Sequence, residues 1–416
     1  MLARLRASAW LLSAGALAGV PAWAQEPTAL VPPPTAPVPT PAPPAPAPAP
    51  APAPAAQPQT NTDVPWRTSY FPYLSGLAND GPLISFRIRR SQAAPYEERV
   101  TARAFAQLDL GIGFRGTRFA VAQFGAPLLM KDWRFSGLVL ATRESRYGFY
   151  GIGNNTTFNS TNVTDADPFF YRVQRTRYQA LVEVTRRLTG PLHLALQGSA
   201  ESAKFAAHDE GTSVFLQTVG TSLKQDDAYL RAALVFDTRD TEYDPHRGLL
   251  LEAVYQVATS GTGYQRAYGI LRTWVPLREG TVFAVRLAGS QLYGTPTLDA
   301  RYMIPGWERP IPVLGGAFSF RGLDSGRYAG KGVLLGNFEI RQNLISFANV
   351  AGLVLVGFVD AGRVFEDTKF TLTTDDVKVG GGAGIALRVL RTTAFTLSLA
   401  RGPDRTRLTF GFGWMF

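Results

Sequence analysis

The sequence contains no cysteine, and among its 416 residues it has only three histidines. Without cysteine, the chain cannot form disulfides, zinc–thiolate sites or a cysteine nucleophile. His193, His208 and His246 are scattered, and neither an H-E-x-x-H metal motif nor a G-x-S-x-G nucleophile turn is present. We therefore expect no enzymatic activity and no cofactor or metal.

Long hydrophobic runs and charged residues are also scarce. After the N-terminal segment no stretch of about 18 apolar residues occurs, so no membrane-spanning helix is expected. Charged residues make up 18% of the chain, whereas soluble domains contain about 25%. A mean hydropathy of -0.02 suits a β-barrel, in which lipid-facing and lumen-facing residues alternate.

The formal net charge is +10, and the calculated isoelectric point is about 9.9. Such a basic chain could bind nucleic acid if its charges formed one patch. Instead the basic residues recur at alternate positions along strand-like segments. This spacing favours one wall of a barrel, and we expect no nucleic-acid partner.

Residues 1–24 have the features of a secretory signal peptide. Arg4 and Arg6 precede an apolar core that is too short to span a membrane, and Ala22-Trp23-Ala24 matches a cleavage site. Residues 25–65 are rich in Pro and Ala, and proline lacks the backbone N–H donor that helices and sheets require. This segment is expected to be a disordered, extended tether in the periplasm.

The pattern from residue 66 to 416 is that of successive β-strands. Apolar residues alternate with polar ones, as in Ile84, Phe86 and Ile88 against Ser85, Arg87 and Arg89. A soluble sheet with one wet face would also alternate. Strands near ten residues long and polar loops that alternate with short turns favour a membrane barrel. Aromatic residues near strand ends, such as Trp274 and Trp414, resemble interfacial girdles.

The fold expected is therefore all-β: a transmembrane antiparallel barrel formed by residues 66–416. At about 22 residues per strand and connection, this length gives about sixteen strands. The stretch 295–332 is long, irregular and rich in Gly and Pro. Because its amides could not be satisfied against lipid, we expect this loop to fold into the lumen.

Two motifs carry charges that should face the lumen. Asp237-Thr238-Arg239-Asp240 ends one strand, and Asp237 and Arg239 share a face on which they can pair. Arg321-Gly322 lies within the irregular loop, where a buried arginine needs acidic partners. Glu339 and Asp360, on the two following strands, are the candidates. The last strand alternates as well, with Phe410, Phe412, Trp414 and Phe416 on one face.

In this order the motifs resemble the barrel of the BamA/TamA family, also called bacterial surface antigen proteins. The matching segments are Asp237–Asp240, Arg321-Gly322-Leu323, Phe358-Val359-Asp360-Ala361-Gly362 and Thr409 to Phe416. The resemblance implies that Arg321 reaches Asp360 and Glu339 and locks the loop inside the barrel. It also implies that the C-terminal aromatics form an insertion signal, and that the first and last strands, Leu83–Arg90 and Arg405–Phe416, meet at a weak seam.

Two features differ from the family. Leu323 stands where the family usually has an aromatic residue. The segment before the barrel is too short for a periplasmic POTRA module of about 75 residues. The family's role in protein insertion, translocation or lipid movement is therefore one expectation, and a passive anion-favouring channel or a surface structural protein is the alternative. The expected location is the bacterial outer membrane. The expected partners are its lipid and lipopolysaccharide and the barrel assembly machinery that inserts the chain, whereas the client stays unknown.

Overall fold

The computed structural model describes residues 13–14, 64–77, 79–259, 263–347, 351–367, 369–370, 372–389 and 392–416, with only the backbone of residues 13–14, 76–77 and 392–394. The predicted signal peptide and tether therefore lie outside the described residues, except for Ser13, Ala14, Val64 and Pro65. No helix in the described part is long and apolar enough to cross a membrane.

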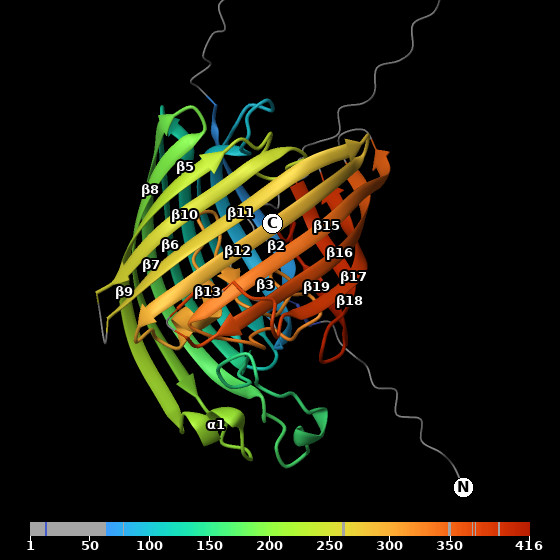
Figure 1. The fold of residues 1–416 in the computed structure, drawn as a ribbon. Coiled ribbons are helices and arrows are strands. Elements are labelled where there is room, and N and C mark those ends of the chain that lie inside the picture. Colours follow the sequence, from blue (N-terminus) through green and yellow to red (C-terminus); the bar gives the residue numbers. More distant parts are fainter. Residues whose placement is uncertain are drawn as a thin grey trace, which may run out of the picture.

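The described chain is almost entirely β-structure (Figure 1). The strands of the main sheet are β1 (Ser13–Ala14), β2 (Trp66–Leu77), β3 (Gly81–Ala93), β4 (Ala102–Gly113), β5 (Arg118–Met130), β6 (Trp133–Gly148), β7 (Arg172–Thr189), β8 (Leu192–Ala206), β9 (Ser222–Asp237), β10 (Gly248–Ala258), β11 (Tyr264–Arg278), β12 (Thr281–Gly294), β15 (Gly332–Phe347), β16 (Ala351–Phe365), β17 (Lys378–Val389), β18 (Thr392–Arg401) and β19 (Thr406–Gly411). The connections contain η1 (Ser160–Asn162), α1 (Val214–Thr218), η2 (Asp299–Tyr302), β13 (Met303–Ile304) and β14 (Ile311–Pro312).

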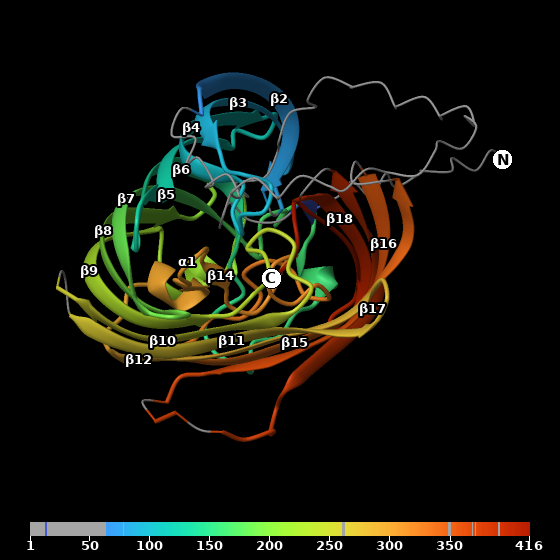
Figure 2. The same cartoon turned by 90° about the horizontal axis from the view of Figure 1, so that it is seen from above.

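Sixteen strands, β2 to β12 and β15 to β19, form an antiparallel meander in which each strand pairs with the next along this order. Seen from above, they curve into a ring (Figure 2). The predicted all-β barrel of about sixteen strands, with a loop folded into it, is confirmed. Within the described ranges no register joins β2 to β19, and the two residues of β1 pair in parallel with Thr409 and Phe410 of β19.

The first strand is not the one that the sequence suggested. Leu83–Arg90 lies in β3 and pairs with β2 on one side and with β4 on the other. The prediction that this segment meets the last strand was wrong, because Trp66–Leu77 forms a further strand in front of it. β2 contains Pro72 near its middle, and a proline in a sequence segment usually indicates that the segment is not an interior strand.

Alternation sorts the side chains between lipid and lumen. In β10, Leu251, Tyr255 and Val257 are exposed on the outer face, whereas Glu252 and Gln256 are buried inside. The assignment of Trp274 and Trp414 to the interfacial girdles was wrong, because both side chains are buried in the interior. Other aromatic side chains are exposed on the outer face, among them Trp66, Tyr70, Phe124, Tyr178, Tyr255 and Phe347.

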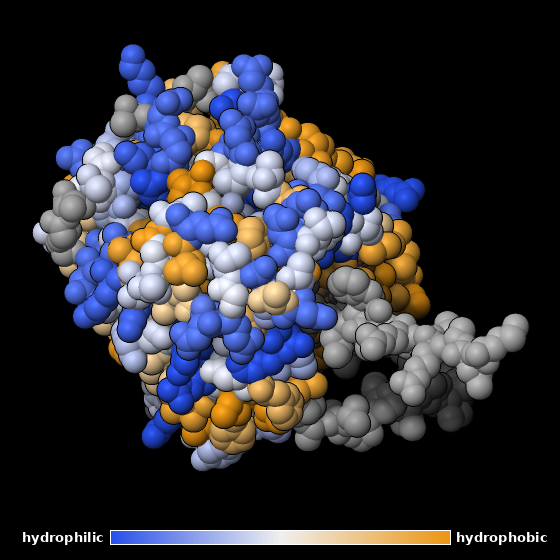
Figure 3. Space-filling model, turned by 90° about the horizontal axis from the view of Figure 1, so that it is seen from below, coloured by the Kyte–Doolittle hydropathy of each residue, from blue (hydrophilic) through white to orange (hydrophobic). Residues whose placement is uncertain are grey.

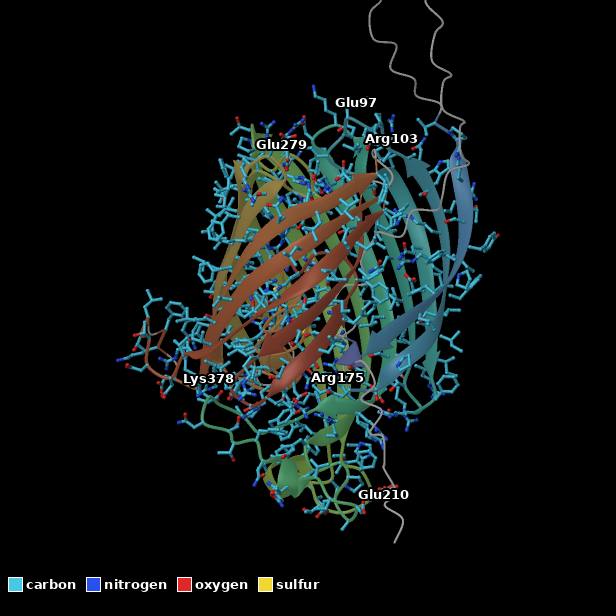
Figure 4. All side chains as sticks on the ribbon, turned by 90° about the vertical axis from the view of Figure 1, so that its right-hand side faces the viewer. Glu97, Arg103, Arg175, Glu210, Glu279 and Lys378 are labelled. Atoms are coloured by element: carbon cyan, nitrogen blue, oxygen red, sulfur yellow. The ribbon has the colours of Figure 1, made fainter. Side chains whose placement is uncertain are left out.

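The two ends of the barrel differ in their connections. One end has short turns, such as 131–132, 190–191 and 279–280, and we call it the short-turn end. The other, the long-loop end, has the connections 149–171, 207–221 and 366–377 and the entry to loop 295–331. Figure 4 shows Glu97 and Glu279 at the first end and Glu210 and Lys378 at the second. In outer-membrane barrels long loops face outward and short turns face the periplasm.

Candidate functional site

The connection 295–331, between β12 and β15, folds into the barrel, and we call it the lumenal loop. Nearly all of its residues from 311 to 330 are buried. Figure 2 shows β14 within the ring of strands. The loop can be buried because it pairs its own backbone: β13 pairs with β14, and Leu314 bridges to Tyr328.

Arg321, from this loop, meets the two carboxylates that the sequence singled out. Its Nε and Nη2 atoms donate to Asp360 Oδ2 and Oδ1 at 3.0 and 2.8 Å, and its backbone N–H donates to Oδ2 at 2.9 Å. Its Nη1 atom donates to Glu339 Oε1 at 2.6 Å. The guanidinium also lies 3.4 Å from the ring centroid of Phe358. All three charged side chains are at most 6% exposed, so this bidentate contact forms away from water, where charge-assisted bonds are strongest.

A chain of further contacts surrounds this pair. Arg341 binds the second oxygen of Glu339 at 2.8 Å, so two arginines and two carboxylates alternate and their charges balance. Asn337 donates to Asp360 Oδ1 at 2.8 Å and to the carbonyl of Ser319 at 2.6 Å. The loop backbone and the strand carboxylate are therefore held by the same amide.

Gly322 is required by a close approach between two backbones. A Cβ atom at this position would lie 2.7 Å from both the N and Cα atoms of Gly402 in the β18–β19 turn. In the other direction, a Cβ on Gly402 would lie 2.2 Å from the carbonyl oxygen of Gly322. Leu323 is fully buried, so the absence of the family's aromatic residue leaves no exposed surface at this point.

The Asp237–Asp240 motif forms a second contact with the loop. Arg239 Nε and Nη2 donate to the two oxygens of Asp237 at 3.0 Å each, and Arg239 Nη2 lies 2.6 Å from Glu308 Oε1. Arg272 Nη1 lies 2.9 Å from the other oxygen of Glu308. Asp240 has a separate role, because its Oδ1 accepts backbone N–H bonds within the turn 238–247. Sequence reasoning missed Glu308, which is the only acid of its Gly- and Pro-rich segment, 303–316.

Two more contacts bind the loop near the long-loop end. Asp299 of η2 lies 2.7 Å from Arg175 Nη1 and 3.3 Å from Arg177 Nη1, both on β7 (Figure 4 labels Arg175). Asp324 pairs with Arg405 at 2.8 Å and with Arg407. A weak signal for the first contact exists in the sequence, because Arg175 and Arg177 alternate along the stretch 168–182, which contains no acid of its own.

The prediction that the last strand runs to Phe416 was wrong. β19 ends at Gly411, Gly413 adopts a φ of 77°, and the chain turns into the lumen. Phe410 and Phe412 stay partly exposed, whereas Trp414 and Phe416 are buried. Three arginines bind this segment through its carbonyls: Arg309 at Trp414 (2.8 Å), Arg286 at Met415 (3.3 Å) and Arg341 at Phe416 (3.1 Å). These hydrogen bonds are charge-assisted and therefore stronger than neutral ones.

A cavity of about 390 Å³ remains beside the loop. It lies between the loop and the walls from β4 to β11, and its lining includes Arg177, Arg231, Arg266, Glu201 and Trp307. A smaller one of about 180 Å³ shares Trp307 and Glu308 with it. Within the described ranges no group of three or more His, Asp or Glu side chains has the arrangement of a metal site.

These features of sheet, loop and motif order match a known family. A model of the Omp85 superfamily domain matches residues 124–413. The chain belongs to the Omp85 superfamily. The resemblance seen in the sequence is confirmed as that of a BamA/TamA-like Omp85 barrel, and membership indicates a bacterial outer-membrane protein.

Solved structures show the same fold. The chain is similar to BamA from Haemophilus ducreyi lacking POTRA domains 1–3, with a TM-score of 0.53 and 13% identity over 83% of this chain and 69% of that one. It is also similar to CdiB from Escherichia coli, with a TM-score of 0.52 and 11% identity over 80% of this chain. The chain covers 60% of the CdiB chain. No curated protein matches.

Proposed function

We propose that this Omp85 barrel takes part in protein insertion or translocation at the outer membrane, and that the lumenal loop keeps it closed at rest. The observation that carries the proposal is the anchoring of the loop by ion pairs to the wall on several sides. In the loop, Asp299 binds Arg175 of β7, and Glu308 binds Arg239 and Arg272. Arg321 binds Glu339 of β15 and Asp360 of β16. A loop so fixed obstructs free diffusion through the lumen, which suits a barrel that opens only for a client.

The unpaired sheet ends support the same proposal. β2 and β19 share no register within the described residues, and each has a complete ladder on one side only. A sheet edge can accept a strand from another chain, so a client strand could pair there. We further propose that residues 1–24 direct export and that residues 25–65 lie in the periplasm. The position of Trp66 at the start of β2, which leads toward the long-loop end, supports this arrangement.

A passive channel is the second candidate, favoured by the cavity of about 390 Å³ with arginines in its lining. Planar-bilayer recordings separate the two functions. For the closed barrel we expect wild-type protein to show little steady current and Arg321→Ala to show frequent openings, because the loop loses its contacts with Glu339 and Asp360. Arg186→Ala, at an exposed position on the outer face, is the matched control and should behave as wild type.

The contrary outcome is equally clear. A large, steady, anion-selective current through wild-type protein, unchanged in Arg321→Ala, would show a passive channel and reject the closed barrel.

A further inference from the structure

A row of basic side chains crosses the outer face near the long-loop end. Arg118 on β5 stands opposite Arg143 on β6, and Lys204 on β8 stands opposite Lys224 on β9. Thr176 on β7 joins the two pairs, because it is the register partner of both Arg143 and Lys204. We call Arg118, Arg143, Lys204 and Lys224 the outer basic row.

All four cations point away from the lumen. Each is exposed, whereas the sequence neighbours Phe119, Thr142 and Ala203 are buried inside the barrel. Five adjacent strands with a spacing of about 4.8 Å place the four charges along a line of about 19 Å.

This arrangement is unfavourable for the protein alone. Like charges directly opposite each other across two strands destabilise a sheet. Within the described ranges no carboxylate lies at ion-pair distance from Arg118, Arg143 or Lys204, and Lys224 has only an exposed contact of 3.9 Å with Asp226. Arg143 donates one bond of 3.3 Å to Gln174, which is neutral. Four cations in line with so little compensation form a complementary surface for an anion.

The rows toward the middle of the barrel indicate where this anion would come from. The next row contains the exposed Tyr178, between Ala141 and Ser202, with Asp226 beyond them. The two rows after it are apolar or small throughout: Ala122, Val139, Ala180, Ala200 and Ala228, then Phe124, Gly137, Val182, Gly198 and Leu230. The outer basic row therefore lies at the boundary between an apolar band and the long-loop end, which Figure 3 shows to be largely hydrophilic.

We propose that the outer basic row binds the phosphate groups of an outer-leaflet glycolipid, a phosphorylated and acylated sugar of the lipopolysaccharide class. Guanidinium groups bind phosphate oxygens in pairs, and lysines add point charges. A headgroup with more than one phosphate can engage both the Arg118–Arg143 pair and the Lys204–Lys224 pair, which a single phosphodiester headgroup cannot do at once. The acyl chains pack on the apolar band below, which a free phosphate ion cannot use. The site is independent of the lumenal loop and of its opening.

Binding of defined lipids to the purified full chain tests this site. The probes are bisphosphorylated lipid A, dephosphorylated lipid A and phosphatidylglycerol, each in phosphatidylcholine vesicles, and inorganic phosphate alone. The variant carries Arg118→Gln, Arg143→Gln, Lys204→Gln and Lys224→Gln. The matched control removes four exposed cations near the short-turn end through Arg67→Gln, Arg90→Gln, Lys131→Gln and Arg186→Gln. Heat-modifiable migration on gels confirms that every variant folds.

We expect the variant to bind bisphosphorylated lipid A at least about tenfold more weakly than wild type, because each basic side chain near an anionic membrane surface adds to binding. The control should bind it as wild type does. Dephosphorylated lipid A, phosphatidylglycerol and inorganic phosphate should bind wild-type protein much more weakly. Equal affinity of variant and wild type for bisphosphorylated lipid A would overturn the proposal. The proposal would also be overturned if phosphatidylglycerol, dephosphorylated lipid A or inorganic phosphate bound wild-type protein as tightly as bisphosphorylated lipid A does. The site would then lack specificity for a phosphorylated, acylated sugar.

Discussion

Single side chains in the lumen act mainly through paired charges. Arg321 is nearly inaccessible, and so are both of its carboxylate partners. A buried ion pair gains little over an apolar pair, but breaking one leaves an uncompensated charge at a site nearly closed to solvent. Without Arg321, the side-chain donors left among the described residues would be Asn337 for Asp360 and Arg341 for Glu339.

Replacement of Arg321 by Ala should lower the free energy of unfolding by about 3–5 kcal/mol. Arg321→Lys should recover only part of this loss, because a single ammonium group cannot bind both oxygens of Asp360 and Glu339 together. Urea unfolding of the refolded protein in lipid vesicles, followed by tryptophan fluorescence, measures both effects. Arg186→Ala should stay within about 0.5 kcal/mol of wild type, and an equally small effect of Arg321→Ala would contradict the buried ion pair.

The lumenal loop connects elements that are distant in sequence. It contacts β7 through Asp299, the end of β9 through Glu308, and the β18–β19 turn through Gly322. The C-terminal segment adds to this assembly, because Arg286 donates both to the carbonyl of Phe318 in the loop and to that of Met415. Loop, last strand and C-terminal segment therefore form one packed unit inside the ring.

Gly322→Ala tests how tightly the loop is packed against the last strands. The added methyl group would overlap the backbone of Gly402 and should cost about 1–3 kcal/mol, as overpacking does. Gly357→Ala on β16 is the control, since a Cβ there meets nothing within 4 Å and the site is exposed. The same unfolding assay compares them. A Gly322→Ala protein as stable as Gly357→Ala would show that the loop and the turn separate readily in solution.

For the whole molecule, the continuity of the sheet matters most. From β3 to β18 each strand has a ladder on both sides, whereas β2, in the part of the chain that the structure describes, has a register with β3 alone. β19 pairs along its length with β18 and, for two residues, with β1. Within the described residues, registers therefore join all neighbouring strands of the ring except the first and last long strands.

Amide hydrogen exchange should reflect this difference. We expect amides of β2 and β19 to exchange at least about tenfold faster than those of β7 and β8, because strands with one ladder open locally at lower free energy. Mass spectrometry of the protein in lipid vesicles, with β7 and β8 as the internal reference, gives the comparison. Equal protection of all four strands would mean that β2 and β19 are joined in the membrane.

The sequence by itself determined the class of fold and much of the lumenal site. Alternation with a period of two follows from the geometry of a strand, so the lipid-facing and lumen-facing residues could be assigned locally. Arg321, Glu339 and Asp360 could be named together because a buried arginine needs acids and few inward-facing acids were available nearby. The superfamily match agrees with the order of the motifs along the chain.

Only the tertiary structure decided which distant charges meet. Glu308 with Arg239 and Asp299 with Arg175 are separated by long stretches of chain, and irregular backbone carries no periodicity from which their position could be inferred. The end of β19 was misjudged for the same reason. Its aromatic alternation favours a straight strand that ends at Phe416. The arginines that bind the carbonyls of residues 414–416 inside the barrel come from the loop, β12 and β15. Local pattern sets the strands, and long-range charge pairing sets what fills the barrel.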